Sequence, residues 1–164
     1  MSVSSPGGGA VRWRVFPLRA RRGARSTAPR PSRPAQLRAL LAVLDEAVAA
    51  QRSADAAVAA CGEPGPVSGR AARDCGDASS ALLRLSARLR EIRLTEPDLV
   101  RAQAYAERLL AYAQWMVQQA ANLAFTVHPD ARTEASRLRL NGLGRPADDL
   151  RRLREDLEAE ADAP

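Results

Sequence analysis

The feature that most constrains this chain is a stripe of apolar and small residues at helical spacing between positions 37 and 61. Its heptad-like pattern keeps these residues on one face of an α-helix for about seven turns. The pattern predicts a helix over residues 35–61, which ends at the breaker Gly62-Glu63-Pro64-Gly65-Pro66. The members of the stripe are Leu37, Leu40, Leu44, Ala47, Ala54, Val58 and Cys61, with Leu41 and Val48 alongside.

A second stripe predicts a helix of similar length over residues 68–94, with Ser68 as a possible N-cap. Gly76 weakens the first turns of this helix, so an alternative start lies near Asp77. The stripe consists of Ala71, Cys75, Ala78, Leu82, Leu85, Leu89 and Ile92.

A third helix is predicted to follow Thr95-Glu96-Pro97-Asp98 and to run to about residue 127. These four residues are typical of a capping box, in which the Thr95 hydroxyl accepts a hydrogen bond from the Asp98 amide. Proline in the first turn costs no helical hydrogen bond. Two shorter helices are predicted near the C-terminus, one after Pro129 and one after Pro146.

Composition and connection lengths together predict the fold class. Hydrophobic residues make up 46% of the chain but aromatic residues only 4%, and Ala and Leu dominate, which favours helices over sheets. Short connections place consecutive helices antiparallel. We therefore expect an all-α fold, an antiparallel helical bundle of three long helices plus two short C-terminal helices. An elongated helical hairpin that completes its core by dimerising is the alternative.

The positive charge is concentrated at the N-terminus. Residues 1–33 carry eight Arg and no acidic residue, whereas residues 34–164 have a net charge of −2. The first segment is also rich in Pro and Gly and poor in apolar residues, so it is predicted to be a disordered basic N-terminal arm. Residues 34–164 are predicted to form a single helical domain.

Arginine-rich arms of this kind can bind the phosphates of nucleic acids, and their aromatic residues can stack on bases. The alternative is a solvated tail, because all 25 basic residues of the chain are Arg, a bias typical of a GC-rich genome. The predicted nucleic-acid-binding residues are Arg12, Trp13, Arg14, Arg19, Arg21, Arg22 and Arg25.

The third predicted helix contains 19 consecutive uncharged residues, from Leu109 to Val127. Its small and apolar residues form a core stripe that consists of Ala102, Ala106, Leu109, Ala113, Met116, Ala120 and Leu123. A second stripe combines aromatic rings with amides and one Arg, a composition typical of protein interfaces. Alternatively, these aromatic residues cap the core with their polar ends in water. The predicted interface residues are Tyr105, Arg108, Tyr112, Trp115, Gln119 and Asn122.

Residues that could support catalysis are scarce. The only histidine is His128 and the chain has no Lys, so sites with several His ligands and Lys-containing phosphate loops are excluded. The tripeptide His128-Pro129-Asp130 resembles the signature of J-domain co-chaperones, but the preceding helix lacks the basic residues of that family. Pro129 and Asp130 are also ordinary helix-start residues. No enzymatic activity, metal or cofactor is predicted.

Cys61 and Cys75 flank the first breaker loop. If the second helix begins near Ser68 and the turn is centred on residues 64–65, Cys75 lies roughly 10 Å along the axis from Cys61, too far for a disulfide. A start at Asp77 would make the bond feasible. In a cytoplasmic protein both cysteines are expected to be core residues.

The sequence has no run of strongly apolar residues long enough to span a membrane and no apolar signal core, so a cytoplasmic location is expected. The predicted function is a non-enzymatic interaction or scaffold protein that forms a homodimer, or binds another helical protein, through the third helix. Nonspecific nucleic-acid association through the arm is the alternative.

Overall fold

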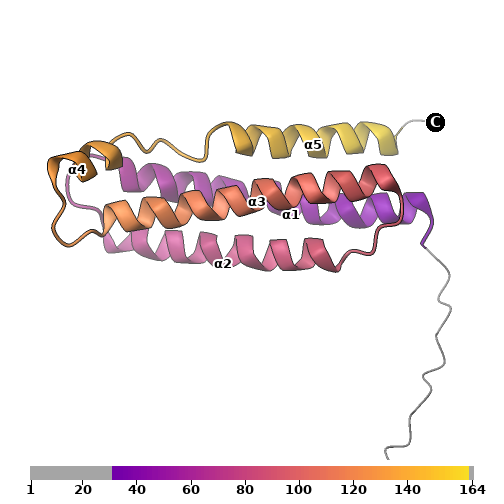
Figure 1. The fold of residues 1–164 in the computed structure, drawn as a ribbon, viewed down its shortest axis with the longest axis horizontal. Helices are drawn as coiled ribbons and strands as arrows, with labels where there is room; N and C mark the ends of the chain where they lie inside the picture. Colours follow the sequence, from indigo (N-terminus) through magenta and orange to yellow (C-terminus); the bar gives the residue numbers. More distant parts are fainter. Residues whose placement is uncertain (1–30, 163–164) are drawn as a thin grey trace, which may run out of the picture. The chain divides into compact units, whose positions relative to one another are not determined.

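The computed structural model describes residues 31–162, which form a bundle of four lengthwise helices with a short helix at one end (Figure 1). The helices are α1 (Arg33–Gly62), α2 (Gly69–Glu91), α3 (Pro97–Ala124), α4 (Ala131–Arg137) and α5 (Arg145–Ala161). The predicted all-α antiparallel bundle is confirmed. The arm predicted for residues 1–33 lies mostly outside the described residues, and α1 begins at Arg33.

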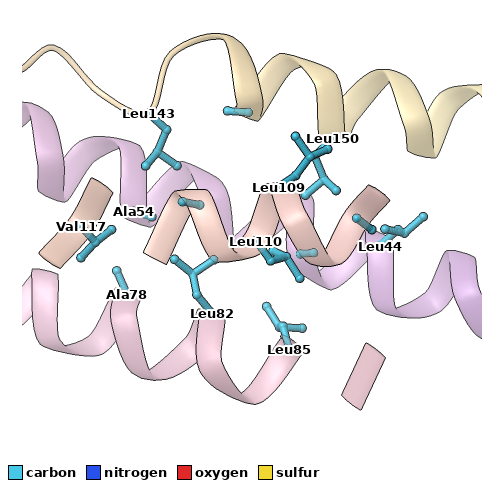
Figure 2. Close-up of a cluster of buried hydrophobic side chains, with 14 of the residues drawn as sticks. Leu44, Ala54, Ala78, Leu82, Leu85, Leu109, Leu110, Val117, Leu143 and Leu150 are labelled. Carbon is cyan, nitrogen blue, oxygen red and sulfur yellow. The ribbon is translucent and has the colours of Figure 1, made fainter. Parts of the chain in front are cut away.

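Consecutive long helices run in opposite directions, and α5 lies against α1 and α3 on the side opposite to α2 (Figure 1). Leucine, valine and alanine side chains from all four long helices meet along the axis of the bundle (Figure 2). Figure 2 shows Leu150 from α5 above Leu110 from α3, with Leu82 from α2 below. Because α5 covers one side of α1 and α3, the core is complete within one copy of the chain.

The stripe predicted for α1 is buried along its whole length, and Gln51 occupies the one heptad position that the apolar residues leave open. Gln51 is only 4% exposed, and neither its amide nitrogen nor its amide oxygen has a hydrogen-bond partner. An unpaired buried amide is costly, but it can specify how neighbouring helices align.

A second buried glutamine on α1, Gln36, makes several hydrogen bonds. Its Nε2 donates to the Pro31 carbonyl oxygen at 2.8 Å and to the Thr95 hydroxyl at 2.9 Å, and its Oε1 accepts from the Thr95 amide at 2.6 Å. The capping box predicted at Thr95 is wrong, because this hydroxyl is engaged by Gln36 and the N-cap residue of α3 is Glu96. Asp98 instead forms an ion pair with Arg33.

Ser68 caps α2 as predicted, since its hydroxyl accepts a hydrogen bond from the Ala71 amide at 3.2 Å. With this start, Cys75 was expected to be far from Cys61, but the two Sγ atoms are 3.6 Å apart. The expectation is wrong because the two helices are not aligned about residues 64–65. Residues 63–68 connect them, and α2 packs so that its second turn lies beside the end of α1, which brings Cys75 next to Cys61.

Arg137, in the last turn of α4, holds this loop in place. Its side chain is 4% exposed, and its guanidinium donates hydrogen bonds to the carbonyl oxygens of Cys61 at 2.8 Å, Glu63 at 2.7 Å and Gly65 at 3.2 Å. It also forms an ion pair with Glu134, which lowers the pKa of that carboxyl below its ordinary value. Arg137 therefore satisfies carbonyl groups that the end of α1 leaves without helical partners.

The segment between α4 and α5 packs closely on α1 at two glycines. A Cβ atom at Gly62 would overlap the Leu140 carbonyl oxygen, and one at Gly142 would overlap the Asp55 carboxylate. Gly142 also has a φ of +122°, a conformation that glycine tolerates best. Asp55 accepts a hydrogen bond from the Leu143 amide at 2.7 Å, which fixes the entry into α5.

Candidate interaction surface

The core face predicted for α3 is largely confirmed. Ala106, Leu109, Ala113 and Ala120 are buried, while Ala102, Met116 and Leu123 are partly buried. The core face is also wider than the predicted stripe. It includes a further row that the sequence reading missed, consisting of Leu99, Leu110 and Val117.

The predicted interface stripe lies on the outer side of α3, away from this core. Tyr112 is 40% exposed and Trp115 is 51% exposed, which are large fractions for aromatic side chains. Arg108 and Asn122 are exposed as well, and Tyr105 and Gln119 are half-buried. The alternative was that these aromatic residues cap the core. Tyr105 fits this alternative because it packs against the buried cluster, whereas Trp115 does not pack there.

The aromatic side chains of this stripe contact one another and a neighbouring cation. The ring centroids of Tyr112 and Trp115 are 5.7 Å apart with the rings tilted by 43°, a favourable aromatic arrangement. The guanidinium carbon of Arg108 lies 5.6 Å from the centre of the Tyr105 ring. These contacts restrict the side chains before any partner binds, which reduces the entropy lost on association.

A groove of about 220 Å³ runs between α2 and α3, and one of its lining residues, Gln118, lies one turn after Trp115. Small residues form its α2 side, and Phe125, which is exposed at the end of α3, lies at its rim. The groove is lined from α2 by Ala72, Cys75, Gly76 and Ser79, and from α3 by Val117, Gln118, Ala121 and Phe125.

Leu83 extends the exposed apolar surface along α2. It follows Ser79 at a spacing of four residues, so it lies on the same side of α2 as the groove, and it is exposed. The sequence reading missed Leu83, although its position beside the core residue Leu82 gave a signal. We define the outer α2–α3 face as Ala72, Gly76, Ser79, Leu83, Tyr112, Trp115, Gln118, Gln119, Asn122 and Phe125.

The outer α2–α3 face contains no charged side chain. Among residues 31–162, the ion pairs lie elsewhere, as in the pairs of Arg154 with Asp45 and of Arg88 with Glu46. On α3 they involve only Asp98 in the first turn. The outer surface of α3 after Leu109 is therefore uncharged, and exposed Arg108 lies at its border, one turn before Tyr112.

The carboxyl groups with perturbed pKa values do not lie on this face. The carboxyl groups with lowered pKa values are Asp98, Glu46, Asp130 and Glu134. The pKa of Glu46 is lowered mainly by its hydrogen bond with Arg88, and that of Asp130 mainly by the Thr133 amide. Asp130 is thus the N-cap of α4, which agrees with the local interpretation of His128-Pro129-Asp130.

Across the described residues, no three His, Cys, Asp or Glu side chains are grouped as metal ligands would be. Nor does this part of the chain include a helix with the length and apolar character needed to cross a membrane. The residues predicted to bind nucleic acid, from Arg12 to Arg25, lie outside the part that the structure describes.

Comparisons with known proteins found no matching family model, curated protein or solved structure.

Proposed function

We propose that this chain is a non-enzymatic interaction protein that self-associates through the outer α2–α3 face. The observation that carries the proposal is the exposure of Tyr112 and Trp115 in the uncharged stretch of α3 that begins at Leu109. Tyr and Trp bury large areas at low entropic cost and dominate the energetics of many interfaces. α5 covers α1 and α3 without covering these two residues.

The absence of charge on this face favours an uncharged partner. A partner that placed charged groups against it would lose their hydration without gaining a counter-charge, which is unfavourable. The same face on a second copy meets this requirement, and a two-fold axis would bring the two identical surfaces together. A second copy is therefore the partner that we propose.

The shape of the face also suits a protein partner. The groove between α2 and α3 has a volume of about 220 Å³, below the roughly 300–1,000 Å³ usual for small-molecule sites. Its small residues, among them Gly76 and Ser79, leave a hollow between α2 and α3. A ring from a second copy can fill such a hollow, as anchor residues do in well-packed interfaces.

The test is the solution mass of the full chain, measured by size-exclusion chromatography with light scattering over a wide range of concentrations. We expect a dimer or larger assembly for the wild type and a monomer for Trp115→Glu, which places a charge in the uncharged face. Val100→Glu is the matched control, because Val100 is also exposed on α3 but precedes the uncharged segment. A wild-type monomer at every concentration, or equal loss in both variants, would overturn the proposal.

Salt dependence separates this proposal from the alternative, nucleic-acid association through the Arg-rich arm. The uneven distribution of charge along the chain favours that alternative, because residues 1–33 contain eight Arg and no acidic residue. Self-association through an uncharged face should persist at high salt, whereas phosphate binding should weaken steeply. Nucleic-acid binding that disappears with high salt, and with deletion of residues 1–30, would support the arm as a second functional element.

A further inference from the structure

Cys61 and Cys75 form a buried pair of thiols at the end of the bundle that holds the α1–α2 loop. Cys61 lies in the last turn of α1, Cys75 lies in the second turn of α2, and their Sγ atoms are 3.6 Å apart. Both are free thiols in the structure. A disulfide needs an S–S distance of about 2.0 Å, so the two atoms would have to move together by about 1.6 Å.

The backbone around the pair is held by hydrogen bonds. Arg137 binds the carbonyl oxygen of Cys61 itself and the carbonyls of the following loop. The thiol of Cys75 is 3.8 Å from the Ala57 carbonyl oxygen, one turn before Cys61 on α1. With the thiols 3.6 Å apart, side-chain rotation is the smallest movement that would close the remaining distance.

The surroundings of Cys75 make its thiol slow to react. Burial, reinforced by the neighbouring Cys61, raises the pKa of Cys75 to about 12. Almost all of this thiol is therefore protonated at neutral pH, and the thiolate is the form that attacks a disulfide. Cys75 also lines the groove between α2 and α3, which leads from the surface toward the pair.

We propose that Cys61 and Cys75 are an oxidisable pair, converted by a small-molecule disulfide into an intrachain disulfide that links α1 to α2. In the first step one cysteine thiolate attacks the oxidant, which forms a mixed disulfide and releases one thiol. The second cysteine then attacks the protein sulfur of that mixed disulfide and releases the second thiol. Two electrons and the two cysteine protons pass to the oxidant, which leaves as two thiols.

The experiment incubates the full chain with glutathione mixtures, from fully reduced to fully oxidised, until its state no longer changes. After acid quenching and alkylation, mass spectrometry distinguishes the dithiol, which takes two alkyl groups, from the intrachain disulfide, which takes none. We expect complete conversion in excess oxidised glutathione. We also expect a rise in Tm on the order of 10 °C, because the bond would close a short loop of the unfolded chain.

The matched control combines Cys75→Ala with Ala78→Cys. Ala78 is buried on α2 three residues further on, so this variant keeps two buried cysteines but moves one thiol by about 4.5 Å along the axis. We expect the control to form no intrachain disulfide under the same conditions. A wild type that stays reduced, that forms only mixed or interchain disulfides, or that oxidises to the same extent as the control would overturn the proposal.

Discussion

The guanidinium of Arg137 in α4 donates a hydrogen bond to the Cys61 carbonyl oxygen at the end of α1, at a distance of 2.8 Å. These residues are 76 positions apart, and the contact joins the C-terminal part of the chain to its first hairpin. It also explains why an arginine is almost completely buried in a short helix. A buried cation is tolerated when it is paired and fully hydrogen-bonded, and Arg137 has both Glu134 and three carbonyl groups.

Replacing Arg137 by alanine should destabilise the bundle, because three loop carbonyls and the Glu134 carboxylate would lose their donor. We expect Tm to fall on the order of 5–10 °C. Arg139→Ala is the matched control, since Arg139 is exposed and only two positions away. Equal changes in Tm for the two variants would show that the Arg137 contacts do not stabilise the loop.

The ion pair between Glu134 and Arg137 should make stability depend on pH. Hydrogen bonding to Arg137 lowers the pKa of Glu134 below its ordinary value of about 4.5. The folded state is therefore favoured by this group above that value, and the contribution is lost as the pH falls through the lowered pKa. We expect Tm to decline below pH 4.5 and Glu134→Gln to reduce the decline. An identical pH profile for both proteins would contradict this assignment.

The two buried glutamines of α1 should respond oppositely to replacement by leucine. Gln51→Leu removes an unpaired amide from an apolar stripe and should increase the free energy of unfolding by about 1–3 kcal/mol. Gln36→Leu should lower it, because Thr95 and Pro31 would lose their partners. Urea denaturation measures both. Destabilisation by Gln51→Leu would show that the amide has a partner, such as bound water.

Two glycines at helix positions should also respond oppositely to alanine. A Cβ atom at Gly76 meets nothing within 4 Å, so Gly76→Ala should stabilise the protein by about 0.5–1 kcal/mol through the better helix propensity of alanine. Gly62→Ala should lower Tm, because the added methyl group overlaps the Leu140 carbonyl oxygen. Thermal denaturation of the two variants compares them, and a stable Gly62→Ala protein would mean that the segment at Leu140 moves freely away from α1.

Trp115→Ala should weaken self-association and leave the monomer folded. Trp115 is 51% exposed, so its truncation should change the free energy of unfolding by less than about 1 kcal/mol. Leu82→Ala, at a fully buried position, should cost about 2–5 kcal/mol. Circular dichroism and sedimentation measure helicity and mass together. Loss of helicity in Trp115→Ala would make this residue part of the core.

Most of the helical structure could be predicted from local pattern. The breaker after Gly62, the cap at Ser68 and the prolines near the starts of α3 and α5 mark helix ends through backbone effects that act within a few residues. The outer side of α3 was also predictable, because its aromatic and amide residues recur at helical spacing. Periodicity does not show whether that face binds a partner, so the predicted interface stays a prediction.

The errors concern contacts between distant parts of the chain. The Thr95 hydroxyl had a plausible local partner in the Asp98 amide, but Gln36 of another helix binds it instead. The separation of Cys61 from Cys75 was derived from an alignment of α1 and α2 about residues 64–65, whereas the packing of the two helices places Cys75 beside Cys61. The residues next to Arg137 in the sequence do not indicate its role, because the carbonyl groups that it binds lie more than 70 residues earlier.

Local sequence pattern gives the number and order of the helices, their ends to within a few residues, their apolar sides, and the uncharged segment of α3. Helix propensity, caps and periodicity all act within a few residues, so they can be read along the chain. Packing between distant segments sets the alignment of α1 with α2, the proximity of Cys61 to Cys75 and the burial of Arg137. Each of these features depends on which helix surfaces pack together. Sequence pattern does not give this, because helices with the same apolar periodicity can pack in many relative alignments.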